Sequence, residues 1–226
     1  HANRVVDHGH ARTRMTHVFR QFGAVIRIRQ HTFVQRLCNA LAQMVMHVLK
    51  TLGKDFDYLV GSQLEGFDTM VRFSDAPVMV IEGDEYLTSA LDPVPKFHKY
   101  HPQIALITGI AWDHINVFPT YDNYVDQFRI FIDSIEPGGS LAYFGGDADL
   151  SALAEKAQVK ATAYNTPNHH IRSGKVVVSK AERYTLEIFG EHNLQNAEGA
   201  RLVCAEIGIS EHDFYTALSS FKGTAK

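Results

Sequence analysis

Two short apolar runs in this 226-residue chain each lead into side chains that could bind a metal ion. The run at 78–81 is followed directly by Glu82, and the run at 104–107 leads shortly to Asp113 and His114. In an open parallel sheet, ligands bind outside the carboxyl ends of the strands, so these groups are expected at one edge of one sheet. Carboxylates there could hold Mg²⁺ together with the phosphates of a substrate, and the imidazole could complete a second cation site.

Each of these groups also has a structural explanation when it is taken alone. Glu82, Asp84 and Glu85 could form a solvated loop, since acid clusters after strands are common. A lone histidine such as His114 is more often a structural residue with satisfied hydrogen bonds than a ligand. The metal site is therefore predicted from the two clusters together, on consecutive strands.

A third polar cluster lies in the sequence FGEHNLQN at 189–196. His192, Asn193 and Asn196 fall at the expected start of a helix, where free backbone N–H groups and side-chain amides can bind an anion or the edge of a purine. Asn193 could instead serve only as a cap of that helix. The cluster is thus a candidate nucleotide site.

The segments that must position these groups alternate between strand and helix. Short apolar or β-branched runs predict strands, and apolar residues at helical spacing predict helices. This alternation favours an α/β fold with a mostly parallel sheet flanked by helices. The predicted strands are at 56–60, 78–82, 104–108 and 140–144, and the predicted helices are at 33–49, 121–135 and 150–157.

The segment at 159–189 has a different character. VKATAYN, KVVVSK and RYTLEIFG are short alternating stretches separated by turn residues, which is typical of antiparallel hairpins. A small appended antiparallel sheet is therefore expected beside the parallel one. Two helices follow, one ended by Gly208 and one begun by Ser210 as its N-cap, with Asp213 completing a capping box.

Composition indicates a cytoplasmic globular protein. Hydrophobic residues make up 45% of the chain, but no apolar run approaches the ~20 residues that span a bilayer, so no membrane partner is expected. Cys38 and Cys204 lie far apart and in no metal-binding spacing, which favours a reducing compartment. Residues 1–50 carry a net charge of +7 in a chain of net charge −3. Their arginines form no periodic face, so no nucleic-acid partner is expected.

From about residue 44 to its end, the chain resembles the central ATP-binding domain of the Mur ligases, which add amino acids or peptides to UDP-N-acetylmuramic acid. VIEGDEY resembles the EADE strand end of that family, ITGIAWDHINVF its NxxxDHxD segment and FGEHNLQNAEGA its GxHNxxNxxAA helix. VGSQLEGF and PKFHKYHP are most similar to the branch that contains the UDP-N-acetylmuramate:L-alanine ligase and the murein tripeptide ligase. The expected organisation is an atypical basic arm at 1–43 and the central domain at 44–226, without the N- and C-terminal domains of the family.

The resemblance implies a P-loop NTPase-like fold and an ATP-dependent amide-bond ligase of peptidoglycan precursor synthesis. Its implied partners are UDP-N-acetylmuramate and either L-alanine or a recycled murein tripeptide, which would be joined through an acyl phosphate. ATP and Mg²⁺ are the implied cofactors, because charge builds up on the phosphoryl group as it is transferred.

The resemblance also implies roles for individual residues. Glu82 would bind the Mg²⁺ that bridges the ATP phosphates, and His114 would bind a second Mg²⁺ near the acyl phosphate, so both are catalytic candidates. The adenine pocket would be lined by His192, Asn193 and Asn196. The metal ligands would be oriented by Asp84, Glu85 and Asp113.

The chain departs from the family pattern at the phosphate loop. A sequence like GTHGKTT is expected at about 34–43, where this chain reads VQRLCNALAQ, with no glycine, lysine or threonine. A phosphate loop needs glycines so that backbone N–H groups can approach the phosphates, and a lysine to neutralise them. Residues 115–132 also lack the lysine that some members carbamylate, and Asn116 replaces the usual aspartate. The alternative function is therefore a catalytically silent Mur-like domain that binds nucleotide weakly or not at all.

Overall fold

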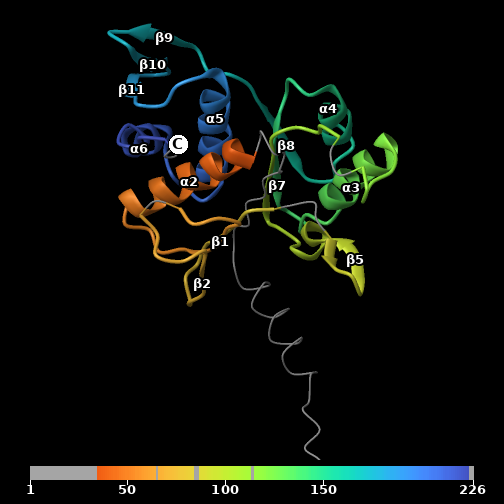
Figure 1. Cartoon of the computed structure of the whole chain (residues 1–226). Helices are drawn as coiled ribbons and strands as arrows, with labels where there is room; N and C mark the ends of the chain where they lie inside the picture. The colour runs from red at the N-terminus through yellow and green to blue at the C-terminus, as the bar shows by residue number, and fades with distance from the viewer. Residues whose placement is uncertain (1–34, 65, 84–86, 113–114, 224–226) are drawn as a thin grey trace, which may run out of the picture.

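The computed structural model of the chain describes residues 35–64, 66–83, 87–112 and 115–223. Helices α2 (Gln35–Thr51), α5 (Glu191–Glu206) and α6 (Glu211–Leu218) gather on one side of the molecule. Helices α3 (Tyr121–Asp133) and α4 (Ala148–Ala154) lie on the other side, with strands between the two groups (Figure 1). No helix in these described ranges is long and apolar enough to cross a membrane.

A three-stranded parallel sheet confirms the predicted α/β class. Its order is β6 (Ile104–Ile107), β7 (Ser140–Phe144) and β8 (Lys160–Tyr164), and each neighbouring pair is parallel. Strand β6 is buried on both faces. Its side chains point alternately to the two faces of the sheet, and each face packs against a different core. Ile104 and Leu106 pack in the core that includes α5, whereas Ala105 and Ile107 pack in the core that includes α3.

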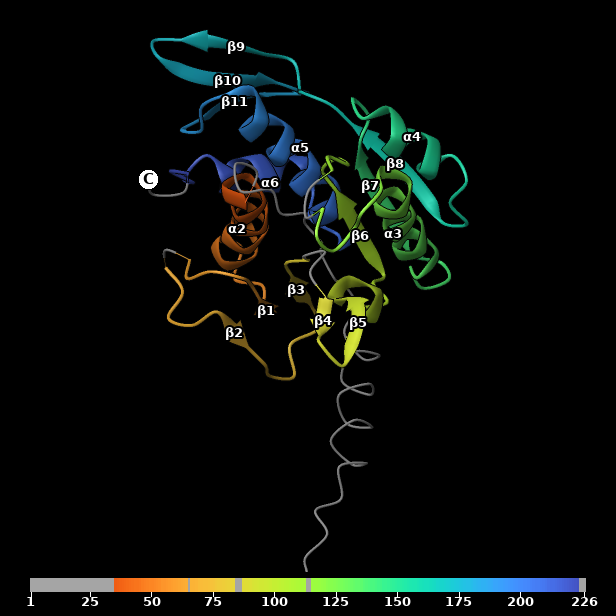
Figure 2. The same cartoon turned by 45° about the vertical axis from the view of Figure 1, so that its right-hand side comes forward.

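A second sheet has the order β2 (Val71–Arg72), β1 (Asp57–Leu59) and β3 (Met79–Ile81). Strands β1 and β3 are parallel, and β2 pairs with β1 in the antiparallel sense. The expectation that β3 and β6 lie on consecutive strands of one sheet is wrong, because β3 pairs in this sheet and β6 in the other. Between them the chain forms the hairpin of β4 (Leu87–Ser89) and β5 (Asp92–Pro95) and the short 3₁₀ helix η1 (Lys96–Lys99), visible in Figure 2.

The appended antiparallel sheet is confirmed, although its first strand was misplaced. It consists of β9 (His169–Arg172), β10 (Lys175–Ser179) and β11 (Arg183–Leu186). The stretch VKATAYN, predicted to be part of a hairpin, instead forms β8 of the parallel sheet. An edge strand pairs on one side only and leaves many side chains exposed, so its sequence alternates like that of a hairpin strand.

Helix α5 packs closely on the parallel sheet. A Cβ atom at Gly199 would lie 3.0 Å from Cζ of Tyr164 on β8 and 3.2 Å from Cδ1 of Leu106 on β6. Any side chain at this position would force these two neighbours to shift by a few tenths of an ångström. The predicted N-cap at Ser210 is confirmed, since its Oγ accepts a hydrogen bond from the backbone N–H of Asp213 at 3.1 Å.

Candidate functional site

Glu82 stands at the carboxyl end of β3, as the strand pattern predicted, and is only 7% exposed. Its backbone N–H donates to the carbonyl of Leu59 at 2.9 Å, which extends the pairing of β3 with β1. Its side-chain Oε2 accepts a hydrogen bond from the backbone N–H of Gly61 at 2.7 Å. The carboxylate is thus fixed where β1 and β3 both end, which is where ligands bind in parallel sheets.

The segment that follows β6 is anchored by Asp147, a residue that the sequence analysis did not single out. Asp147 is the N-cap of α4, and its Oδ1 accepts from the backbone N–H of Leu150 at 2.9 Å. Its Oδ2 accepts from the backbone N–H of Ile110, just after β6. An aspartate directly after two glycines and before a helix was a recognisable cap signal, but its second hydrogen bond joins residues far apart in the sequence.

Further along the same segment, Trp112 donates from Nε1 to the carbonyl of Phe118 at 3.0 Å. Tyr121, at the start of α3, donates from its hydroxyl to Asp149 on α4. The described residues on both sides of positions 113–114 are therefore held by hydrogen bonds. Asp113 and His114 themselves lie outside the described residues, as do Asp84 and Glu85, while Asn116 is described and exposed.

The α5 cluster contains one exposed and one buried polar side chain. His192 is exposed in the first turn, whereas Asn196, one turn later, is 5% exposed. Asn193 donates from Nδ2 to the carbonyl of Phe189 at 2.7 Å, so its amide fastens the start of the helix to the preceding chain. This contact agrees with the capping role considered for Asn193, and the adenine-binding roles of all three residues stay predictions.

A relay of hydrogen bonds places the start of α5 at the carboxyl end of β8. Thr166, two residues beyond β8, donates from Oγ1 to Oε1 of Glu191 at 2.9 Å. Gln195 donates from Nε2 to the same hydroxyl at 3.0 Å. The α5 cluster therefore lies beside the end of a parallel strand. Sequence reasoning missed Thr166 and Gln195 because nothing local in the sequence pairs a loop residue with a helix residue so far away.

A buried ion cluster fixes the middle of α5 to its neighbours. Glu198 is 6% exposed and accepts hydrogen bonds from Arg201 Nε at 2.7 Å and from the Tyr215 hydroxyl at 2.8 Å. The Nζ of Lys180, which follows β10, lies 3.0 Å from its Oε2. Burial opposes ionisation of Glu198, but these donors outweigh it and hold the pKa of Glu198 below its ordinary value.

The described residues contain no group of three or more histidine, cysteine, aspartate or glutamate side chains that could hold a metal ion. Glu82 is the one candidate metal ligand that the described ranges include. A single buried carboxylate at a strand end nevertheless fits Mg²⁺, which commonly takes only one or two protein carboxylates and completes its shell with water and phosphate oxygens. At the position expected for a phosphate loop, residues 35–43 form the first turns of α2, and the boundary predicted at 43/44 falls inside that helix.

Comparisons with known proteins point to one family. A family model described as the Mur ligase middle domain matches residues 32–204. A UDP-N-acetylmuramate–L-alanine ligase of Rubrobacter xylanophilus is 28% identical over 192 residues, which cover 81% of this chain and 41% of the relative. A UDP-N-acetylmuramate–L-alanyl-γ-D-glutamyl-meso-2,6-diaminoheptandioate ligase of Haemophilus influenzae is 26% identical over 197 residues, covering 79% and 42%. The chain thus spans about two fifths of the length of these curated relatives.

Solved structures share the fold. A UDP-N-acetylmuramate:L-alanyl-γ-D-glutamyl-meso-diaminopimelate ligase from Neisseria meningitides aligns with a TM-score of 0.81 at 21% identity, covering all of this chain and 78% of the other. A MurF ligase from Thermotoga maritima in complex with ADP aligns with a TM-score of 0.70 at 11% identity, covering 97% and 56%. At these identities the likeness concerns the fold alone.

Proposed function

The chain belongs to the Mur ligase family, and we propose that it acts as the ATP-binding domain of a ligase that forms an amide bond in a peptidoglycan precursor. Its curated relatives carry the names of such ligases. The substrates proposed here are UDP-N-acetylmuramate and either L-alanine or a recycled murein tripeptide. The single observation that carries the proposal is the position of Glu82, a buried carboxylate fixed where β1 and β3 end, within the span that matches the family.

In the proposed reaction, the γ-phosphoryl group of ATP is transferred to the carboxylate of the muramic acid lactyl group. The incoming amine then attacks the acyl phosphate, the amide bond forms, and inorganic phosphate leaves. Little covalent chemistry falls to the protein in such a transfer, so positioning and charge neutralisation provide most of the acceleration. Bound Mg²⁺ would neutralise charge that develops on the phosphoryl oxygens.

Glu82 would hold Mg²⁺ through its carboxylate, which the Gly61 N–H orients. A fixed carboxylate loses little conformational freedom when it binds the ion, so its geometry favours binding. His114 is proposed as the ligand of a second Mg²⁺ on the basis of the sequence.

The start of α5 would receive the nucleotide base. His192 is exposed there, and Asn196 lies one turn further along the helix, whose start is held beside the end of β8. Side-chain amides both donate and accept hydrogen bonds, as the edge of adenine requires. The relay of Thr166, Gln195 and Glu191 supports this proposal because it fixes the helix start relative to the sheet.

A second candidate is a silent Mur-like domain that binds nucleotide weakly or not at all. It is favoured by the sequence at 35–43, which is the start of α2 and has no glycine, lysine or threonine to hold phosphates. Without a phosphate loop, the γ-phosphate of ATP would lack its main backbone and lysine contacts.

Calorimetric titration with ATP and Mg²⁺ separates the two candidates. If the chain is a ligase domain, the wild type should give a saturable heat of binding. Glu82→Ala and His114→Ala should each lose most of this heat. Equal heats in all three proteins would remove the metal-site assignment. No saturable heat in the wild type would establish the silent domain.

A further inference from the structure

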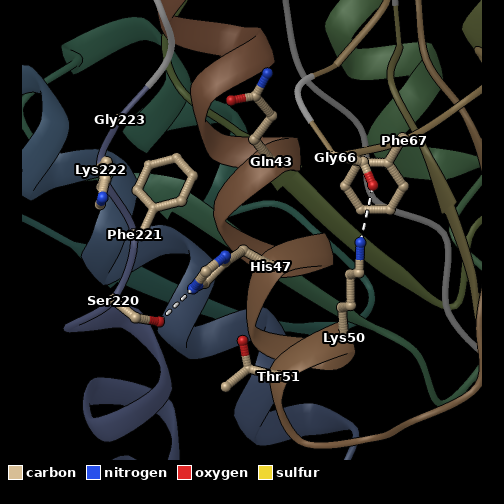
Figure 3. Close-up of a pocket in the computed structure, with 10 residues that line it drawn as sticks. All are labelled: Gln43, His47, Lys50, Thr51, Gly66, Phe67, Ser220, Phe221, Lys222 and Gly223. Atoms are coloured by element: carbon tan, nitrogen blue, oxygen red, sulfur yellow. Dashed lines mark hydrogen bonds between the residues drawn. The ribbon is translucent and has the colours of Figure 1, made fainter.

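A pocket of about 380 Å³ lies along one face of α2, and its described lining includes none of the residues proposed to bind nucleotide (Figure 3). Helix α2 contributes Gln43, His47, Lys50 and Thr51, which recur at helical spacing and so share one face. The loop at 66–67 stands on one side of this face and the segment at 220–223 on the other. The volume is within the range of small-molecule sites.

The described residues that line this pocket carry positive charge and no negative charge. Lys50 and Lys222 are ammonium groups at neutral pH, and neither Asp nor Glu is among the described lining residues. The excess is local, since the whole chain has a net charge of −3. A neighbouring pocket beside β1 shares Lys50, Gly66 and Phe67 with it but is also lined by Asp55 and Asp68. The α2 pocket therefore favours an anion.

Lys50 is held in a fixed position at the edge of the pocket. Its Nζ donates to the carbonyl of Gly66 at 2.8 Å and lies 5.1 Å from the centroid of the Phe67 ring. The ammonium group has three donors, and one hydrogen bond to a carbonyl leaves its charge unneutralised. A fixed, unneutralised cation can bind an anion without much further loss of side-chain entropy.

Two phenyl rings provide apolar walls. Phe67 and Phe221 lie on opposite sides of α2 in Figure 3. The ring of Phe67 also packs edge-on against Tyr58 at 5.2 Å, and that of Phe221 lies 5.3 Å from the imidazole of His47. Both rings are thus held by neighbours. Phe67 is partly exposed and can pack against a planar apolar group, whereas Phe221 is only 6% exposed and closes the other side of the pocket.

His47 and Ser220 form a hydrogen bond that could suggest a nucleophile and its base, but the geometry points to binding only. His47 Nε2 lies 2.9 Å from Ser220 Oγ and 3.2 Å from the carbonyl of Ala217. Ser220 Oγ donates to the same carbonyl at 2.9 Å, so its proton is directed away from the imidazole. Burial lowers the pKa of His47, so the ring is neutral near pH 7 and adds no charge.

We propose that this pocket binds a small organic anion that carries a flat apolar group. Lys50 contacts the anionic end and the ring of Phe67 beside it contacts the flat group. Lys222, on the other side of α2 in Figure 3, adds positive charge to the pocket. Aromatic carboxylates and aromatic phosphates share this chemistry. The site is distinct from the proposed nucleotide site, so it can be tested independently of ligase activity.

Nuclear magnetic resonance of the ¹⁵N-labelled chain tests the proposal with four probes. The anionic aromatics are 2-naphthoate and 2-naphthyl phosphate, and the controls are neutral naphthalene-2-methanol and inorganic phosphate. We expect saturable shift changes centred on Gln43, His47, Gly66 and Ser220 for at least one anionic aromatic, with affinity about tenfold above that for either control. The tighter of the two anions identifies the anionic group. Shift changes centred elsewhere, or equal affinity for the neutral probe, would overturn the proposal.

Matched lysine variants locate the charge contact. Lys50→Ala should weaken binding of the anion about two- to fivefold, as expected for a partly solvated charge pair, and Lys222→Ala should weaken it less. Added salt should weaken binding further. Lys54→Ala is the control, because Lys54 lines only the neighbouring pocket. Unchanged affinity in Lys50→Ala, with the fold intact by circular dichroism, would contradict the assignment. So would a larger loss in Lys54→Ala.

Discussion

One carboxylate oxygen of Asp147 accepts a hydrogen bond from the backbone N–H of Ile110, while the other caps α4 at Leu150. The bond joins the chain just after β6 to the chain just after β7, so it ties together the carboxyl ends of two neighbouring parallel strands. Gly109 allows this approach, since a Cβ atom there would lie 3.2 Å from Asp147 Oδ2. Asp147 is therefore a positioning residue for the segment that leads to His114.

Replacing Asp147 should destabilise the fold through two lost contacts. Asp147→Ala removes the cap of α4, worth about 1 kcal/mol, and leaves the partly buried N–H of Ile110 without this acceptor, which costs about 1–3 kcal/mol more. Chemical denaturation measures the change. Glu155→Ala at the other end of α4 is exposed and should change stability by less than about 0.5 kcal/mol. Equal stability of the two variants would show that the Asp147 contacts contribute nothing.

The Glu198 cluster makes a second prediction. Glu198→Ala should lower the free energy of unfolding by about 3–5 kcal/mol, because it leaves Arg201 and Lys180 as half-buried cations without their carboxylate. Thermal and urea unfolding are suitable measurements. Lys175→Ala serves as the control, since its ion pair with Glu187 is exposed and worth little. A loss below about 1 kcal/mol in Glu198→Ala would mean that the cluster is not a stabilising unit.

The same cluster predicts how stability depends on pH. The pKa of Glu198 is lowered in the folded state, so its contribution is fully present above the unfolded-state pKa of about 4.3 and is lost as the pH falls through the lower folded-state pKa. Stability measured from pH 6 to pH 3 should therefore fall more steeply in the wild type than in Glu198→Gln. Equal slopes of stability against pH in the two proteins would contradict the lowered pKa of Glu198.

The packing of α5 on the sheet gives a fourth prediction. Gly199→Val should destabilise the chain by about 1–3 kcal/mol, since a side chain would meet Tyr164 and Leu106 at 3.0 and 3.2 Å. Ala205→Val on the exposed side of the same helix is the matched control, with an expected cost below about 1 kcal/mol. Similar unfolding midpoints for the two variants would show that α5 can move away from the sheet.

Local sequence patterns predicted the individual strands and helices well, and pairing between distant segments poorly. The runs at 104–107 and 140–144 read as strands because they are short and apolar, and the structure confirms both. The stretch that forms β8 was assigned to a hairpin, because an edge strand and a hairpin strand have the same alternation. Nothing within the run at 79–81 indicates that β3 pairs with β1 rather than with β6.

The same limit applies to the candidate site: positions with a local signal were predictable, and contacts between distant residues were not. The position of Glu82 at a strand end was predictable because a carboxylate directly after a short apolar run is a local signal. The roles of Asp147, Thr166 and Gln195 depend on hydrogen bonds between residues 25 to 37 positions apart, which no local pattern reveals.

The most direct measurement of the central claim is Mn²⁺ binding by electron paramagnetic resonance in the presence of a non-hydrolysable ATP analogue. Mn²⁺ substitutes for Mg²⁺ at oxygen ligands, and its binding is measured as a loss of the signal of the free ion. If Glu82 holds the ion, the wild type binds Mn²⁺ in a nucleotide-dependent manner, Glu82→Gln binds it at least about tenfold more weakly, and the exposed control Glu155→Gln binds it as the wild type does. Equal binding by Glu82→Gln and the wild type, or no nucleotide-dependent binding by the wild type, would contradict the claim.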